Sequence, residues 1–143
     1  MIDHAGLVVS DFIRSRAFYT AALKPLGYAL ITEVPATLTG TVDFAGFGVP
    51  PKPDFWISHG TPNRPPIHVA FRASSRAAVD AFYITALAAG GRDNGPPGVR
   101  PHYHPNYYGA FVLDPDGHNI EAVCHDPVQR ATVDPQVPPD ISQ

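Results

Sequence analysis

The most constraining feature of this sequence is that its first half recurs, without a gap, in its second half. The segment AFYTAAL at 17–23 matches AFYITAL at 81–87, and in the same register His4 matches His68 and Gly27 matches Gly91. Further matches in that register pair Ser10 with Ser74, Ala22 with Ala86 and Leu23 with Leu87. A repeat of this length indicates a duplicated structural unit, so the two halves are expected to fold alike.

Each copy follows the same pattern of predicted elements. A short apolar strand, IDHAGLVVS or PPIHVAFRA, precedes a helix, and three strand-like segments come after it, the weakest of them around 91–95. The candidate helix caps are Ser10 or Asp11 in the first copy and Ser74 or Ser75 in the second. We therefore predict an α+β fold of two βαβββ modules, residues 1–60 and 61–126, followed by a proline-rich tail, 127–143. Neither module has enough strands to bury a sheet alone, so the two should form a curved mixed sheet around a cleft, within one chain or across a dimer.

Composition excludes several classes of function. The hydrophobic share of 44% is typical of a globular protein, and the net charge of −3 with no basic run argues against nucleic acid as a partner. No apolar stretch approaches the length of a membrane span, and the N-terminus does not have the pattern of a secretory signal. Cys124 is the only cysteine, which precludes an internal disulfide and is consistent with a cytoplasmic location. We interpret it as a buried packing residue.

Three strand positions could together bind a metal. Alternate residues of a strand share a face, so His4 shares one with Gly6, His68 with Ala70, and Glu121 with Asn119. If those faces line the cleft, two imidazoles and one carboxylate converge, with small residues beside the histidines leaving room for a ligand. Such a triad suits a catalytic divalent ion such as Fe or Mn.

A second candidate region is the segment RPHYHPNYYG at 100–109. We expect it to be a substrate-facing loop in which His104, Tyr103 and Tyr108 act as acids or bases; the alternative is an aromatic loop packed over a sheet edge. Arg72 could bind an anionic group if it points inward, or form a surface salt bridge. The predicted substrate-binding residues are Trp56, Arg72, Tyr107 and Phe111.

The motifs HAGLVVSDFIRSRAFYTAAL, IHVAFRA and AFVLDPDGHNIEAV resemble those of the glyoxalase I, bleomycin-resistance and extradiol-dioxygenase superfamily, also called vicinal oxygen chelate proteins. The resemblance covers about residues 1–125, and its most specific part is the D-P-D-G turn before a glutamate. It implies a divalent metal, Fe, Mn, Zn or Ni, bound by His4, His68 and Glu121, in an enzyme acting on a small oxygen-chelating substrate.

The resemblance leaves the reaction open. It implies lyase, isomerase or ring-cleaving dioxygenase chemistry, or a metal-free protein that sequesters a ligand as bleomycin-resistance proteins do. The paired modules and the proline-rich tail favour a homodimer. Glyoxalase I typically has a fourth ligand on its fourth strand, but the matching segment here, DFWISHG, has neither Glu nor Gln, and Trp56 stands near that place. This departure weakens a strict assignment to glyoxalase I.

Overall fold

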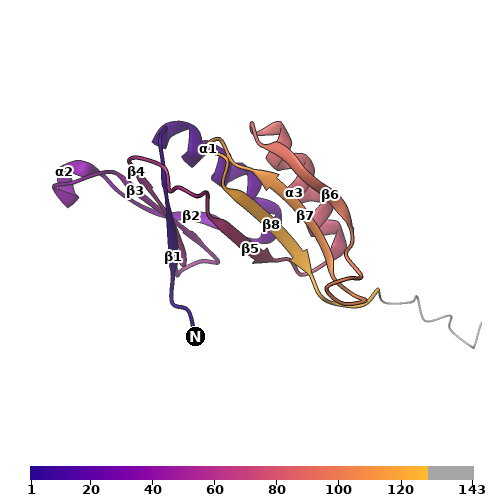
Figure 1. The fold of residues 1–143 in the computed structure, drawn as a ribbon. Coiled ribbons are helices and arrows are strands. Elements are labelled where there is room, and N and C mark those ends of the chain that lie inside the picture. The colour runs from indigo at the N-terminus through magenta and orange to yellow at the C-terminus, as the bar shows by residue number, and fades with distance from the viewer. Residues whose placement is uncertain (129–143) are drawn as a thin grey trace, which may run out of the picture.

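The structure, a computed structural model, describes residues 1–128. The chain forms two four-stranded sheets, each accompanied by a helix (Figure 1). The first half contains β1 (Ala5–Val9), α1 (Phe12–Ala22), the short 3₁₀ helix η1 (Lys24–Leu26), β2 (Ala29–Val34), α2 (Ala36–Thr39), β3 (Phe44–Gly48) and β4 (Phe55–His59). The second contains β5 (His68–Arg72), α3 (Arg76–Ala88), β6 (Arg92–Val99), β7 (Tyr108–Leu113) and β8 (Asn119–Cys124).

The two sheets have the same topology, which confirms the predicted pair of βαβββ modules. Their strand orders are β1-β4-β3-β2 and β5-β8-β7-β6, and in each the first and last strands of the module pair in parallel while the others pair antiparallel. Within residues 1–128 the two mixed sheets are separate, since no strand of one pairs with a strand of the other.

The helices begin at capping residues that the sequence predicts. The Asp11 carboxylate accepts a hydrogen bond from the Arg14 backbone N–H at the start of α1, and the Ser75 hydroxyl accepts one from Ala78 at the start of α3. After α1 the chain turns at Gly27, whose φ of 82° is a left-handed conformation that favours glycine. The four-residue helix α2 was not predicted from the sequence.

Strand β6 extends beyond the predicted segment around 91–95, because it continues through Pro96 and Pro97. It is an edge strand with two irregularities, between Asp93 and Gly95 and between Gly95 and Gly98. Proline is tolerated on an edge, since its missing N–H faces away from the ladder. The predicted short strand around 91–95 is therefore eight residues long.

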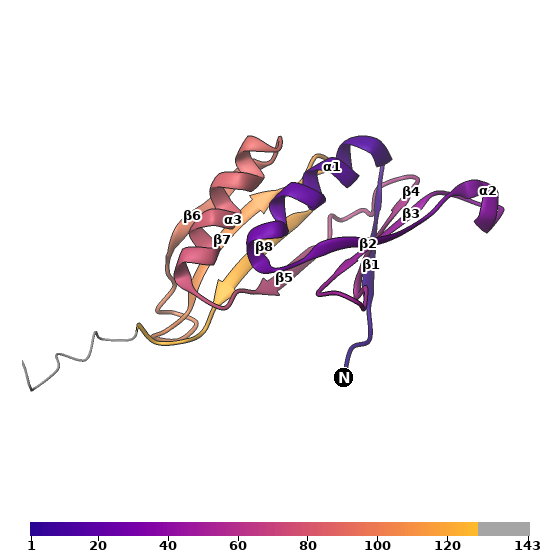
Figure 2. The ribbon, with the colours of Figure 1, turned by 180° about the vertical axis from the view of Figure 1, so that it is seen from behind.

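The two long helices, α1 and α3, lie on the same side of the molecule and contact each other (Figure 2). The core lies between helices and sheets, with Phe18, Tyr19 and Phe82 almost completely buried. It is continuous between the modules, because Phe55 of β4 and Phe71 of β5 meet edge to face with ring centroids 5.1 Å apart. The predicted burial of Cys124 is confirmed.

The imidazole of His118 also joins the modules. This fully buried side chain lies in the turn between β7 and β8. Its Nδ1 accepts a hydrogen bond from the Ile67 N–H at 3.0 Å, and its Nε2 lies 3.0 Å from the carbonyl oxygen of Val8 in β1. Those contacts require a neutral ring protonated at Nε2. Each sheet keeps a second face that carries no helix, and His68, Glu121 and Trp56 lie on those faces.

Candidate metal and substrate site

The structure brings two of the three predicted metal ligands together. Nε2 of His68 lies 3.1 Å from Oε2 of Glu121, on the helix-free face of the second sheet. The parallel pairing of β5 with β8 places Ala70 opposite Glu121, so the two functional side chains lie diagonally across neighbouring strands. Glu121 is buried, with 3% of its side chain exposed, whereas 48% of the His68 side chain is exposed.

Neighbouring side chains hold this pair in place. The hydroxyl of Tyr107 donates a hydrogen bond to Oε1 of Glu121. Nδ2 of Asn119 lies 2.7 Å from Nδ1 of His68, and Oδ1 of Asn119 accepts a hydrogen bond from Asn94. Burial, and secondarily the hydrogen bond to Glu121, raise the pKa of Tyr107 well above its usual value, so this hydroxyl stays protonated and acts as a donor.

Glycine at position 109 gives Tyr107 access to the carboxylate. A Cβ at Gly109 would lie 3.2 Å from Cε1 of Tyr107 and 3.4 Å from Oε1 of Glu121. The Tyr107 ring therefore lies across the backbone of β7, over a position where any side chain would crowd it. The sequence pattern YYG places two tyrosines before this glycine, and only the structure shows which of them uses the space.

His4 does not join His68 and Glu121 within one chain. It lies just before β1, an edge strand of the first sheet, with 62% of its side chain exposed, and its Nδ1 is 2.8 Å from Asp3 Oδ1. Within residues 1–128, no three His, Cys, Asp or Glu side chains are grouped closely enough to hold a metal ion. The convergence predicted from strand faces is therefore not found inside a single chain.

The contact with Asp3 places a carboxylate acceptor at Nδ1 of His4. A carboxylate at one ring nitrogen is the usual partner of a histidine that ligates a metal through the other. Lys52 also contacts Asp3, at 3.1 Å. Hydrogen bonds from His4 and Lys52 lower the pKa of the Asp3 carboxyl.

Of the three predicted catalytic residues, Tyr108 lies apart from Tyr103 and His104. Tyr108 lies on the helix side of β7, where its hydroxyl donates to Asp80 of α3 at 2.6 Å, so it does not share a face with Glu121. The neighbouring Tyr107 contacts the carboxylate instead. Tyr108 also lies under the guanidinium of Arg76, at 4.9 Å from the ring centroid. These contacts give Tyr108 a packing role against α3.

The other loop residues surround Tyr107. The ring of Tyr103 lies 4.7 Å and that of His104 lies 5.4 Å from the Tyr107 ring, measured between centroids. Nε2 of His104 is 2.8 Å from Nδ1 of His125, a residue that the sequence analysis did not select. Tyr103 is 60% exposed. The aromatic side chains of this loop thus cluster together, and their contact with Glu121 runs through Tyr107.

The predicted substrate-binding residues are also separated. Phe111 pairs directly with Glu121 across β7 and β8, and its ring stacks near His68 with centroids 6.2 Å apart. Trp56 lies on the helix-free face of the first sheet, where a Cβ at Gly46 would be 2.9 Å from its ring. The exposed Arg72 lies 3.6 Å from Asp126, which matches the alternative of a surface salt bridge.

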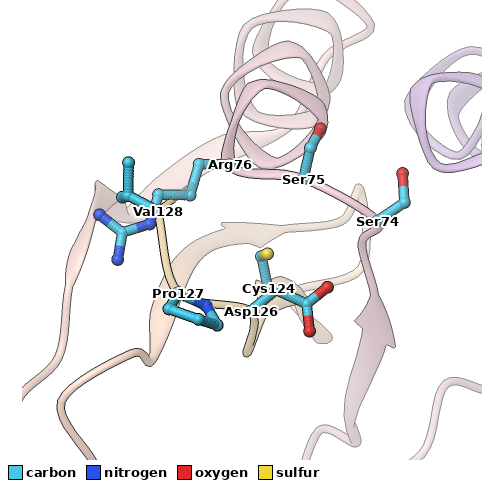
Figure 3. Close-up of a pocket in the computed structure, with 7 residues that line it drawn as sticks. All are labelled: Ser74, Ser75, Arg76, Cys124, Asp126, Pro127 and Val128. Atoms are coloured by element: carbon cyan, nitrogen blue, oxygen red, sulfur yellow. The ribbon is translucent and has the colours of Figure 1, made fainter. Parts of the chain in front are cut away.

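An open pocket of about 620 Å³ lies elsewhere, at the N-terminus of α3 (Figure 3). Figure 3 shows the sulfur of Cys124 pointing toward the first turn of that helix. Ser75, which lines the pocket, already uses its hydroxyl to cap α3. The pocket is lined by none of the residues predicted for the site.

The family model described as "Glyoxalase/Bleomycin resistance protein/Dioxygenase superfamily" matches residues 1–122. Among solved structures, a glyoxalase/bleomycin resistance protein from Albidiferax ferrireducens T118 is 27% identical with a TM-score of 0.70, over 85% of this chain and 97% of that one. A glyoxylase/bleomycin resistance protein/dioxygenase domain from Frankia sp. EAN1pec is 19% identical with a TM-score of 0.67, over 88% and 98%.

A more distant structural neighbour is the fosfomycin resistance protein FosX from Listeria monocytogenes, solved with Mn(II) and sulfate. It is 17% identical to this chain with a TM-score of 0.63, over 87% of this chain and 91% of that one. A search of the curated proteins gave no match. Among residues 1–128, no helix is long and apolar enough to cross a membrane.

Proposed function

Because the chain belongs to the glyoxalase/bleomycin resistance protein/dioxygenase superfamily, we propose that it is a metal-dependent enzyme acting on a small oxygen-chelating substrate. The observation that carries this proposal is the contact between His68 and Glu121. An imidazole and a buried carboxylate side by side on an open sheet face are two of the three ligands of a facial triad. The reaction we propose is lyase, isomerase or ring-cleaving dioxygenase chemistry.

The missing ligand is best supplied by a second copy of the chain. His4 and His68 occupy equivalent positions of the repeat, and each lies at the edge of a helix-free sheet face. In a two-fold dimer, the first-sheet face of one copy would cover the second-sheet face of the other, and the same contact would occur twice. Each of the two sites would then contain His4 from one copy with His68 and Glu121 from the other.

The donor set suits Fe, Mn, Zn or Ni, which accept imidazole and carboxylate ligands. When bound, such an ion would act as a Lewis acid that polarises and orients two neighbouring oxygens of the substrate. Glu121 would turn an oxygen toward the ion, and the Tyr107 hydroxyl, kept protonated, would then be placed to donate to a substrate oxygen. His104 and Tyr103 beside Tyr107 are proposed as further proton carriers.

Metal content tests the ligand assignment. Wild-type protein loaded with Mn(II) and then dialysed should hold about one ion per chain by elemental analysis. His68→Ala and His4→Ala should each lose it, whereas His59→Ala, which alters an exposed histidine at the end of β4, should keep it. Full occupancy in His68→Ala would contradict the assignment. A wild-type protein that retains no ion would instead favour a metal-free ligand-binding protein.

Mixed dimers test the sharing of the site. Neither His4→Ala nor His68→Ala homodimers would contain a complete ligand set. A dimer with one chain of each kind would contain one complete site, made from the intact His4 of one chain and the intact His68 of the other. We expect co-expressed, doubly tagged mixed dimers to hold about one ion per dimer. No recovery of metal would show that the site is not shared in this way.

A further inference from the structure

Arg100, which follows β6, lies on the same sheet face as His68 and Glu121. Its guanidinium carbon is 5.7 Å from the centroid of the Phe111 ring. Its Nη2 donates a hydrogen bond to the Pro96 carbonyl oxygen at 2.6 Å, so the side chain folds back along β6. A Cβ at Gly98 would lie 2.9 Å from Nη1, which shows that glycine at this position leaves space for the guanidinium.

The charge of Arg100 is not matched by a carboxylate. In the part of the chain that the structure describes, the guanidinium forms no ion pair, and its hydrogen-bond partner is a neutral carbonyl. A held, partly desolvated guanidinium of this kind is well suited to bind a carboxylate or phosphate.

The functional groups follow one line across the sheet. His68 stacks near Phe111, Phe111 pairs with Glu121, and the guanidinium of Arg100 lies near the Phe111 ring. Neighbouring strands are about 4.8 Å apart, which places the guanidinium roughly 5–10 Å from the Glu121 carboxylate. That separation is about the length of a single six-membered ring with one substituent.

We infer from this arrangement that the substrate is an anion with three parts. Two neighbouring oxygens lie at the His68–Glu121 end, a flat or short apolar body covers Phe111, and a carboxylate or phosphate binds Arg100. The inference rests on the proposed function, because it assumes that chelation occurs at His68 and Glu121. Arg100 is then the residue that selects anionic over neutral substrates.

Catechol and 3,4-dihydroxybenzoate form a matched pair of probes, since they share the vicinal oxygens and differ by one carboxylate. Titration calorimetry on the Mn(II)-loaded protein should show the benzoate binding at least about tenfold more tightly than catechol, as expected for charge-assisted hydrogen bonds. Arg100→Gln should remove this preference and leave catechol affinity and metal content unchanged. Arg100→Lys should retain part of it, and Arg92→Gln, an exposed arginine of β6, should retain all of it.

The outcomes separate this inference from the proposed function. An equal preference for the benzoate in wild type and Arg100→Gln would overturn the role of Arg100. Parallel loss of both probes in Arg100→Gln would also overturn it, because the residue would then be supporting the loop and not selecting the anion. Binding of neither probe by wild-type protein that holds Mn(II) would refute the three-part substrate while leaving the metal ligands intact. A wild-type protein without metal would refute the proposed function itself.

Discussion

The amide nitrogen of Asn119 lies 2.7 Å from Nδ1 of His68, on the side of the imidazole opposite the Glu121 carboxylate. A histidine that binds a metal through Nε2 carries its proton on Nδ1 and needs an acceptor there. With metal bound, the Asn119 amide would turn its oxygen toward Nδ1, which makes Asn119 the side chain that fixes the orientation of this ligand.

Asn119→Leu is therefore expected to weaken metal binding about 10–100-fold, the usual cost of removing the partner of a ligating histidine. Asn119→Asp keeps an acceptor at the same place and should retain most of the affinity. Competition with a chelator of known affinity measures both variants. Equal weakening in the two would indicate a general disturbance of β8 and would contradict the specific role of the acceptor.

The position of His118 predicts a large effect on stability. His118→Ala would leave the Ile67 N–H and the Val8 carbonyl without partners at a buried contact between the two modules. Each unsatisfied buried group costs about 1–3 kcal/mol, so for the two groups we expect a loss of about 2–6 kcal/mol in the free energy of unfolding. Urea denaturation measures this loss. His102→Ala, at an exposed position, should change the free energy by less than about 0.5 kcal/mol.

The pairing of modules could be predicted from the sequence, but the partners of His118 could not. The repeat places equivalent strands and helices correctly, because hydrophobic periodicity and caps such as Asp11 and Ser75 are local signals. The packing of one module against the other depends on contacts such as Phe55 with Phe71, which have no signature in the spacing of residues. The expected convergence of His4 with His68 failed inside one chain for that reason.

The register of β7 explains why Tyr107, and not the predicted Tyr108, contacts Glu121. Side chains alternate along a strand, so the choice between Tyr107 and Tyr108 depends on which of them shares the face of Glu121. The pairing of Phe111 with Glu121 decides this, and it places Tyr108 on the helix side. A run of two tyrosines does not reveal the register. Arg100 was missed for a similar reason, since its position over Phe111 depends on the fold of the segment GPPG.

A buried tyrosine predicts the response of stability to alkaline pH. Tyr19 donates a hydrogen bond to Asp114 at 2.5 Å, and burial, followed by the charge of Asp114, raises its pKa well above the usual value of 10. The folded protein therefore holds this proton at a pH where the unfolded chain has released it. The contribution to stability is complete below about pH 10 and falls as the pH rises further, by up to about 1.4 kcal/mol per unit.

Tyr19→Phe should thus be less stable than wild type near neutral pH but should lose less stability between pH 10 and 11. Tyr28, whose pKa is raised to about 12 by burial and by its hydrogen bond to Asp54, contributes to the same decline between pH 10 and 12. Urea denaturation at several values of pH gives the slope of the free energy of unfolding against pH for wild type and for Tyr19→Phe. A slope unchanged by Tyr19→Phe would show that other groups cause the alkaline loss.

The single tryptophan provides a direct signal for the proposed dimer. Trp56 lies on the helix-free face of the first sheet, against Gly6 and Gly46 and next to Phe44. If a second copy covers this face, dilution from micromolar to nanomolar concentration should shift the tryptophan emission to longer wavelength as the indole becomes hydrated. Sedimentation velocity at the same concentrations should show the dimer dissociating in parallel.

Phe44→Arg places a charge on that face, and we expect it to be a monomer whose emission is shifted at every concentration. Leu38→Arg is the matched control, because Leu38 is an exposed residue of α2 and the substitution introduces the same charge outside the proposed interface. It should behave as wild type. The proposed contact predicts that loss of the dimer in Phe44→Arg is accompanied by loss of metal, since His4 and His68 would no longer meet. A monomer that retains its metal would place the site within one chain.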